Sequence, residues 1–303
     1  MAGIELNNIF DKNGKKDSSK LSAFAKAIWT NKREITDIKT KLYPMIDADA
    51  VPTFEFLSAV FSNITLIKIP TNDINNRQTL ATDLNVFENF IPKLNIEAQN
   101  SDVIFLANIN PELQFNVLDI AKNTTKNSFV GLDTMDLWIN SAEKSLKKVI
   151  TKSDVIMIDQ SEARLLSGEN NLKNAGRKIL KLGAKYVVIK KGEHGILIFT
   201  NDRDYALPGY LTNNVKDPTG AGDSFAGAFF GFLDKCRSYD TKDIFHASIF
   251  GTIIASYTVE NFGVESLLQI NGEMIYKRYL DYMNLIGYKY IYSENNFKDY
   301  LNL

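Results

Sequence analysis

The sequence predicts an α/β protein whose mainly parallel central sheet is covered by helices on both faces. Two observations predict this: short apolar runs alternate with helical segments through the middle of the chain, and a glycine-rich turn near residue 220 directly precedes an apolar helix. Strands that alternate with helices of this length are typical of parallel sheets. The chain has 303 residues, of which 45% are hydrophobic, so one large α/β domain can bury its own core.

The expected strands are short runs rich in β-branched or aromatic residues, as in buried parallel strands. They cover residues 103–107, 129–132, 155–158 and 186–189, and an earlier strand is expected at 64–69. Helical spacing predicts helices at residues 21–29, 54–61, 112–122, 142–150, 172–182, 225–233 and 244–259, and Gly183 suits the C-cap of the fifth of these.

Charge and cysteine content point to a protein that binds small ligands. Lys and Arg number 35 against 36 Asp and Glu, and a net charge of -1 favours neither nucleic acid nor a membrane surface as partner. Cys236 is the single cysteine and no apolar run is long enough to span a bilayer. No charged start followed by an apolar signal core opens the sequence, so we expect a cytoplasmic protein.

The stretch 217–228 combines a turn, an anion cradle and a candidate base. Pro218 and the glycines at 220 and 222 require a tight turn before the helix. The N–H groups of Gly220, Ala221 and Gly222 would then lie at the positive helix end, where proteins bind phosphate. Asp223 would lie at the same end, within reach of a substrate hydroxyl. The arrangement suits phosphoryl transfer, although a bare G-x-G-D is also found as a turn before an Asp-capped helix.

Polar residues follow four of the predicted strands. They are Asn108, Asp133, Asp159 and Lys190. Ligands of parallel α/β sheets bind outside the carboxyl ends of the strands, so these residues are expected to share a rim with the glycine turn. Polar residues end most strands in any case, so each one alone is weak support for a site.

The string from Asp217 through T-G-A-G-D to the small-residue helix resembles the signature of the PfkB (ribokinase-like) carbohydrate and nucleoside kinases. The resemblance implies a ribokinase-like three-layer α/β/α fold. It also implies transfer of the γ-phosphoryl of ATP to an alcohol of a sugar, polyol or nucleoside, with Asp223 as base and Gly220, Ala221 and Gly222 as anion hole. Mg²⁺ and a monovalent cation are the implied ions.

Three further segments resemble parts of this family. The run Asp159–Glu162 is similar to its N-x-x-E motif, which implies that Glu162, with Asp159 in place of Asn, helps to hold Mg²⁺ through water. The segment with Lys190, Gly192 and Gly195 resembles the family's glycine-containing strand end that lies along the nucleotide, with Lys190 where a Thr or similar residue is frequent.

The resemblance also assigns Thr219, and Gly251 and Thr252 on the helix 244–259, to ATP binding. By the same resemblance Asn108, Asp133 and Asp223 would contact the acceptor. Closer still, the segments 76–79, 84–87, 105–109 and 132–135 with Trp138 resemble a group of bacterial PfkB-type sugar kinases.

The first quarter departs from the family. Residues 1–46 form an atypical segment before a kinase domain at 47–303, no di-glycine motif precedes the helix at 54–61, and only a short polar turn at 71–76 stands where lid strands are usual. Either the lid is reduced and the pocket open, with a raised share of futile ATP hydrolysis, or residues 1–46 replace the cover. A homodimer through lid strands is common in the family.

Two other nucleotide-binding folds do not fit the sequence. The sequence has no G-x-x-x-x-G-K-[ST] for a P-loop, and its G-x-G lies too late for a Rossmann fingerprint. The alternative that the altered first quarter leaves open is a catalytically degenerate ribokinase-like binding or scaffold protein.

Overall fold

The computed structural model describes residues 64–68, 78–84, 90–124 and 128–289. The chain divides into two compact units, Met1–Phe90 and Ile91–Leu303. The predicted boundary after residue 46, the helices expected at 21–29 and 54–61 and the turn at 71–76 lie outside the described residues. The division into an atypical segment and a kinase domain stays a prediction.

The described part of the first unit is one antiparallel pair of strands. Strand β1 (Ile64–Lys68) pairs with β2 (Gln78–Asp83), and Ile64 lies opposite Asp83. The register shifts between Leu66 and Ile67, which marks a bulge. The strand expected at 64–69 is therefore confirmed.

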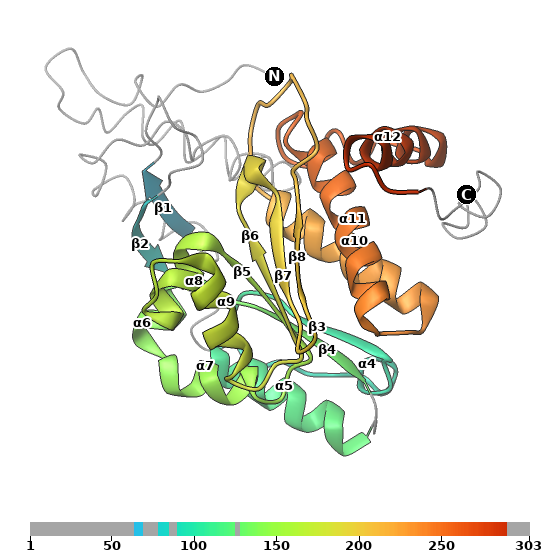
Figure 1. Cartoon of the computed structure of the whole chain (residues 1–303). Helices are drawn as coiled ribbons and strands as arrows, with labels where there is room; N and C mark the ends of the chain where they lie inside the picture. The colour runs from blue at the N-terminus through green and yellow to red at the C-terminus, as the bar shows by residue number, and fades with distance from the viewer. Residues whose placement is uncertain (1–63, 69–77, 85–89, 125–127, 290–303) are drawn as a thin grey trace, which may run out of the picture. The chain divides into compact units, whose positions relative to one another are not determined.

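The second unit is built on a six-stranded sheet of order β3-β4-β5-β6-β7-β8 (Figure 1). The four predicted strands are confirmed, run parallel to one another and are joined by helical crossovers. The antiparallel pairings of β6 with β7 and of β7 with β8 had not been predicted. The strands are β3 (Val103–Leu106), β4 (Phe129–Asp133), β5 (Val155–Asp159), β6 (Tyr186–Lys190), β7 (Ile196–Phe199) and β8 (Asp204–Leu207).

Helices cover both faces of this sheet, and alternate residues of a strand contribute to the two cores. On β5, Ile156 and Ile158 join the core under α5, α7, α8 and α9, whereas Val155 and Met157 join the core under α10, α11 and α12. The order α helices, sheet, α helices is visible in Figure 1, and the predicted three-layer α/β/α architecture is confirmed.

The helices of the second unit have these bounds: α4 (Ile96–Gln99), α5 (Pro111–Thr124), α6 (Asp136–Ser141), α7 (Glu143–Ile150), α8 (Gln160–Ser167), α9 (Leu172–Leu180), α10 (Ala221–Cys236), α11 (Thr241–Thr258) and α12 (Gly272–Leu285). The four helices expected at 112–122, 142–150, 225–233 and 244–259 match α5, α7, α10 and α11. None of the described helices is long and apolar enough to cross a membrane.

The end of α9 corrects one sequence expectation. Helix α9 ends at Leu180 with Lys181 as its C-cap, so Gly183 is not the capping residue. Gly183 instead adopts a φ of 126° in the following turn, where a Cβ atom would approach the Thr151 Cα to 3.0 Å. The glycine is needed for the turn into β6 rather than for ending the helix.

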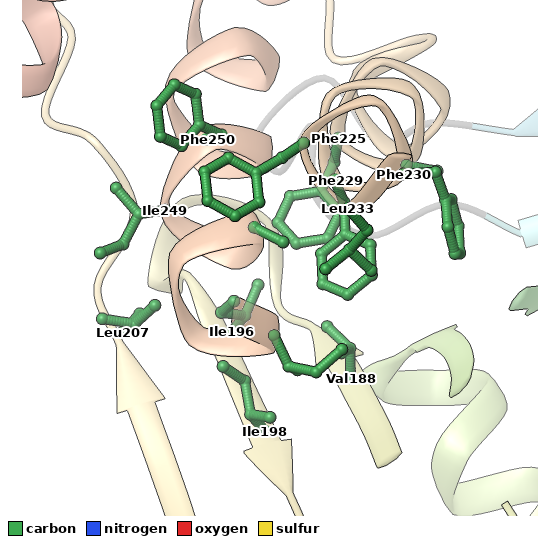
Figure 2. Packing of buried hydrophobic residues seen from close by; sticks show 14 of the residues in the cluster. Val188, Ile196, Ile198, Leu207, Phe225, Phe229, Phe230, Leu233, Ile249 and Phe250 are labelled. Atoms are coloured by element: carbon green, nitrogen blue, oxygen red, sulfur yellow. The ribbon is translucent and has the colours of Figure 1, made fainter. Parts of the chain in front are cut away.

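Aromatic packing places the start of α10 against the sheet. The Phe230 ring fills the space beside Gly131 of β4, where a Cβ atom would overlap it, and it stacks on Phe105 of β3 at 4.7 Å between ring centroids. Figure 2 shows Phe225, Phe229 and Leu233 of α10 in the same apolar layer over Val188 and the β7 strand. This packing fixes how α10 crosses the strands, and with it the position of the glycine turn that precedes it.

Candidate active site

The start of α10 is a glycine turn with no side-chain cap. Gly220 is the N-cap residue, adopts a left-handed φ of 81° and makes no side-chain capping hydrogen bond. The Ala221 N–H donates to the Pro218 carbonyl at 3.2 Å, within the turn. Amides in the first turn of a helix have no intrahelical acceptor and lie at its positive end. The geometry fits the predicted anion hole, with the Ala221 amide partly engaged.

Asp223 lies in the first turn of α10 and is exposed. The helix begins at Ala221, two residues before Asp223, so Asp223 is not the N-cap that the simpler interpretation of the motif would require. The positive end of the helix dipole stabilises the negative charge of a carboxylate in this first turn, and the exposed side chain remains accessible to a hydroxyl. The position is the one predicted for a general base.

Lys190 and Asp133 form an ion pair at the ends of two strands. Lys190 is the last residue of β6 and Asp133 the last of β4, and the Lys190 Nζ lies 3.0 Å from the Asp133 Oδ2. The two side chains keep only 18% and 12% of their exposure. Burial opposes the charge on the ammonium, but the carboxylates of Asp133, Glu162 and Asp223 outweigh it and raise the pKa of Lys190. Lys190 therefore stays protonated and positively charged at this edge of the sheet.

The same ammonium lies beside the glycine turn. A Cβ atom on Gly222 would stand 3.4 Å from the Lys190 Nζ. The structure thus brings together Gly222, Asp223, Lys190 and Asp133, which are far apart in sequence. A cation, a helix N-terminus and a carboxylate meet at the carboxyl edge of the sheet, as the predicted rim requires.

Asp159 and Glu162 form a reciprocal capping box at the start of α8. The Asp159 Oδ1 accepts from the Glu162 N–H at 2.8 Å, and the Glu162 Oε2 accepts from the Asp159 N–H at 2.9 Å. Glu162 is 8% exposed, and burial, followed by the charge of Asp159, raises its pKa to about 8. Two carboxyl groups in this setting favour a nearby cation.

The carboxylates fit magnesium better than a protein-enclosed metal. No group of three or more His, Cys, Asp or Glu side chains gathers as a metal site among the described residues. Mg²⁺ keeps several of its waters and uses one or two protein carboxylates together with substrate phosphates. Asp159 and Glu162 therefore fit the water-mediated role predicted for them.

The turn after β6 depends on glycine for close backbone approach. Gly192 and Gly195 have φ values of 57° and 78°; Gly192 begins a short 3-10 helix (Gly192–His194) and Gly195 is its C-cap. A Cβ atom on Gly195 would lie 2.1 Å from the Leu207 carbonyl oxygen and 2.5 Å from the Gly209 nitrogen. These contacts explain the glycines through the backbone alone, and their contact with ATP stays a prediction.

The ends of β3 and β4 are tied together by Gln114. Its Nε2 donates to the Ala107 carbonyl at 2.9 Å and to the Asp133 carbonyl at 3.1 Å. Asn108, which follows β3, accepts a hydrogen bond from the Trp138 Nε1 at 2.9 Å. The predicted acceptor ligands Asn108 and Asp133 therefore sit at neighbouring strand ends, each already engaged within the protein.

Gly251 and Thr252, which were expected to contact ATP, lie in the part of α11 that packs against α10. A Cβ atom on Gly251 would lie 2.7 Å from the Phe225 ring, so the glycine lets this ring approach α11. The buried Thr252 Oγ1 donates to the Ser248 carbonyl at 2.9 Å. The ATP contacts of both residues stay predictions.

Asp217 is a candidate that the sequence showed only as the first residue of the motif. It is 5% exposed, its Oδ1 accepts from the Thr219 N–H at 2.9 Å, and its Oδ2 is buried with no hydrogen-bond partner in the described part of the chain. A buried carboxylate oxygen without a donor is unfavourable unless a cation is present. The signal in the sequence was an acidic residue next to a proline, whereas the burial of its carboxylate is known only from the structure.

The pfkB family carbohydrate kinase model matches residues 64–271. The chain belongs to the PfkB family. The match covers more than half of the chain, includes the whole rim described above and begins at β1. The family expected from the T-G-A-G-D string is therefore confirmed.

Among curated PfkB relatives, the chain is 29% identical to a cytidine kinase of Thermococcus kodakarensis over 46% of this chain and 51% of that protein. It is 30% identical to a ribokinase of Staphylococcus aureus over 42% of each chain. A nucleoside kinase of Methanocaldococcus jannaschii is 27% identical over 58% of this chain and 55% of that protein. The chain spans about half the length of these relatives. The predicted closeness to bacterial sugar kinases stays a prediction.

Solved structures show the same fold. The ribokinase of Giardia lamblia matches with a TM-score of 0.60 at 16% identity, over 72% of this chain and 71% of that one. A fructokinase of Vibrio cholerae, solved with fructose, ADP and calcium, matches with a TM-score of 0.56 at 15% identity, over 71% and 72%. At these identities the likeness concerns the fold, and it confirms the ribokinase-like architecture.

Proposed function

We propose that this PfkB-family protein transfers the γ-phosphoryl group of ATP to an alcohol of a sugar, polyol or nucleoside. The observation that carries the proposal is the meeting of the glycine turn at Gly220–Gly222, Asp223 and Lys190 at one edge of the sheet. A base, an anion hole and a cation are the parts that phosphoryl transfer needs from a protein. Relatives named as cytidine kinase, ribokinase and nucleoside kinase support the acceptor class.

Each residue has a defined part in the transfer. Asp223 takes the proton of the acceptor hydroxyl, and the hydroxyl oxygen forms a bond to the γ-phosphorus of ATP. The bond from that phosphorus to the oxygen bridging the β- and γ-phosphates breaks, and ADP leaves with the electron pair. The amides of the glycine turn and the Lys190 ammonium stabilise the negative charge of the group in transit.

Magnesium and a monovalent cation have separate residues in this proposal. Glu162, with Asp159, would hold Mg²⁺ through water, and the ion supplies charge neutralisation at the phosphates. Asp217 would hold the monovalent cation, since its buried Oδ2 has no donor among the described residues. Gly192, Gly195, Thr219, Gly251 and Thr252 remain the proposed contacts of the nucleotide.

The scaffold alternative gains no support from the described residues. The proposed base Asp223 and the glycine turn stand together at the start of α10, which supports the kinase over the scaffold. The two functions still make different predictions about turnover.

The deciding experiment measures ADP release and product formation from ATP and Mg²⁺ across a panel of sugars, polyols and nucleosides. Transfer to at least one acceptor, lost in the Asp223→Asn variant, is the expected result. ATP binding without transfer to any acceptor would reject the kinase and leave the scaffold.

A further inference from the structure

The cation beside the glycine turn lies in acidic surroundings. Asp133, Glu162 and Asp223 all act on Lys190, and Asp159 lies next to Glu162. Phosphates that approach this edge are repelled by these carboxylates, so the position of the Lys190 ammonium affects whether an anion is attracted.

Hydrogen bonds fix the position of Asp133, and its carboxylate pairs with Lys190. Its Oδ1 accepts from the Thr134 N–H at 2.8 Å, and its carbonyl is fixed by Gln114. Its Oδ2 is 3.0 Å from the Lys190 Nζ, and the residue as a whole is 8% exposed. An oxygen buried and paired in this way is poorly placed to receive a hydroxyl of the acceptor as well.

We infer that Asp133 is a positioning residue, which holds the Lys190 ammonium at the start of α10 so that it contacts the phosphoryl group being transferred. The inference rests on the proposed phosphotransfer and deepens it. It replaces the acceptor contact that the sequence resemblance implied for Asp133.

The competing partners of Lys190 give this role its physical reason. Without the Asp133 carboxylate, the ammonium would be attracted to Asp223 and Glu162, the other carboxylates that act on it. Pairing with Asp223 would engage the proposed base in an ion pair. Asp133 therefore competes with Asp223 for the ammonium.

The test compares binding of Mg²⁺ with a non-hydrolysable ATP analogue and with ADP by calorimetry on the full chain, without any acceptor. Lys190→Met removes a charged hydrogen-bond donor and should weaken the ATP analogue by about 10- to 100-fold. ADP lacks the γ-phosphate, so the affinity of Lys190→Met for ADP should differ from that of the parent protein by less than about 3-fold. Asp133→Asn keeps the size of the side chain and its contact with Thr134. It should weaken binding of the ATP analogue by about 3- to 10-fold and leave ADP binding nearly unchanged.

The double variant separates positioning from direct contact. If Asp133 acts through Lys190, Asp133→Asn has no further effect on analogue binding in the Lys190→Met background. An equal further loss in that background would overturn the inference, as would an equal loss of ADP and analogue binding in Asp133→Asn. If Asp133→Asn alone does not fold, Lys190→Met and the double variant still decide, because the double variant leaves no unpaired buried charge.

A matched control is available in the same sheet. Asp154→Asn makes the same chemical change at the other end of the strands, where Asp154 pairs with Lys185. It should leave the ratio of analogue to ADP affinity unchanged. Because no acceptor is used, a protein that transfers phosphate to none of the panel still answers this question, and the two failures stay distinct.

Discussion

Two Lys–Asp pairs flank strand β6, one at each end. At the start of the strand, the Lys185 Nζ lies 2.7 Å from the Asp154 Oδ1, and 69% of the Lys185 side chain is exposed. At the end, Lys190 lies 3.0 Å from Asp133 with 18% exposed. The chemical groups are the same, but the Lys190 pair is more buried and lies beside the glycine turn at the start of α10.

The pair at the start of β6 belongs to the framework of the sheet. The Asp154 Oδ2 accepts from the Val130 N–H at 2.8 Å, and its carbonyl accepts from the Lys185 and Tyr186 amides at 2.9 Å. Asp154 thereby joins the beginnings of β4, β5 and β6. The comparison teaches that chemically identical ion pairs differ in what they offer a ligand, because only the Lys190 pair is largely buried beside the glycine turn at the start of α10.

The largest effect should come from the base at the carboxyl edge. Asp223→Asn keeps the size of the side chain but removes its capacity to take a proton, so turnover should fall by about 10²- to 10⁴-fold. ATP binding and thermal unfolding should stay near those of the parent protein. Turnover like that of the parent protein would remove Asp223 from the mechanism and break the contrast between the edges.

The next effect concerns magnesium at the same edge. Glu162→Gln keeps the capping geometry at α8 but cannot become a carboxylate when a cation is present, so the Mg²⁺ concentration for half-maximal activity should rise by about 10- to 100-fold. A magnesium titration at saturating ATP measures it, with Glu169→Gln as control, because Glu169 pairs with Lys178 away from the rim. Identical titrations for the parent and Glu162→Gln would make Glu162 a capping residue only.

The opposite edge should affect stability and leave catalysis intact. Asp154→Ala removes the acceptor of the Val130 N–H and should lower the free energy of unfolding by about 1–3 kcal/mol. The kcat measured well below the unfolding temperature should not change. Denaturant unfolding and steady-state kinetics on one preparation check both, and a loss of kcat without a loss of stability would contradict the division.

The smallest effect comes from a histidine at neither edge. His246 in α11 is 3% exposed, and burial, then the charge of Lys242, lowers its pKa from 6.5 against the opposing charges of Asp243 and Asp240. Below pH 6.5 the histidine is protonated in the unfolded chain, whereas in the folded protein it stays neutral down to a lower pH. Stability is therefore present above the unfolded pKa and is lost as the pH falls toward the folded one.

The measurement is denaturant unfolding at about pH 7.5 and about pH 5.5, where this group accounts for at most about 1.4 kcal/mol of lost stability. His246→Phe should reduce the loss by that amount, since the ring is kept among Phe232 and Phe245 but does not titrate. An equal loss in the variant would assign the pH dependence to other groups.

The sequence predicted the chemistry of the rim better than its contacts. The glycine turn with Asp223 was evident because turn residues, a helix start and a carboxylate are adjacent in the chain. Asp133 was placed at the correct strand end, but its pairing with Lys190 spans 57 residues and depends on the neighbouring order of β4, β5 and β6. The expected lid and the substitute cover by residues 1–46 lie outside the described residues.

By itself the sequence determined the alternation of strands and helices, the four parallel strands and the family, because periodicity, turn chemistry and a local motif are properties of neighbouring residues. Only the tertiary structure decided that Gly251 admits the Phe225 ring, that the Asp217 Oδ2 is buried, and that Lys190 meets both Asp133 and the start of α10. Burial and long-range pairing arise from the packing of separate elements on one sheet, and no local pattern carries that information.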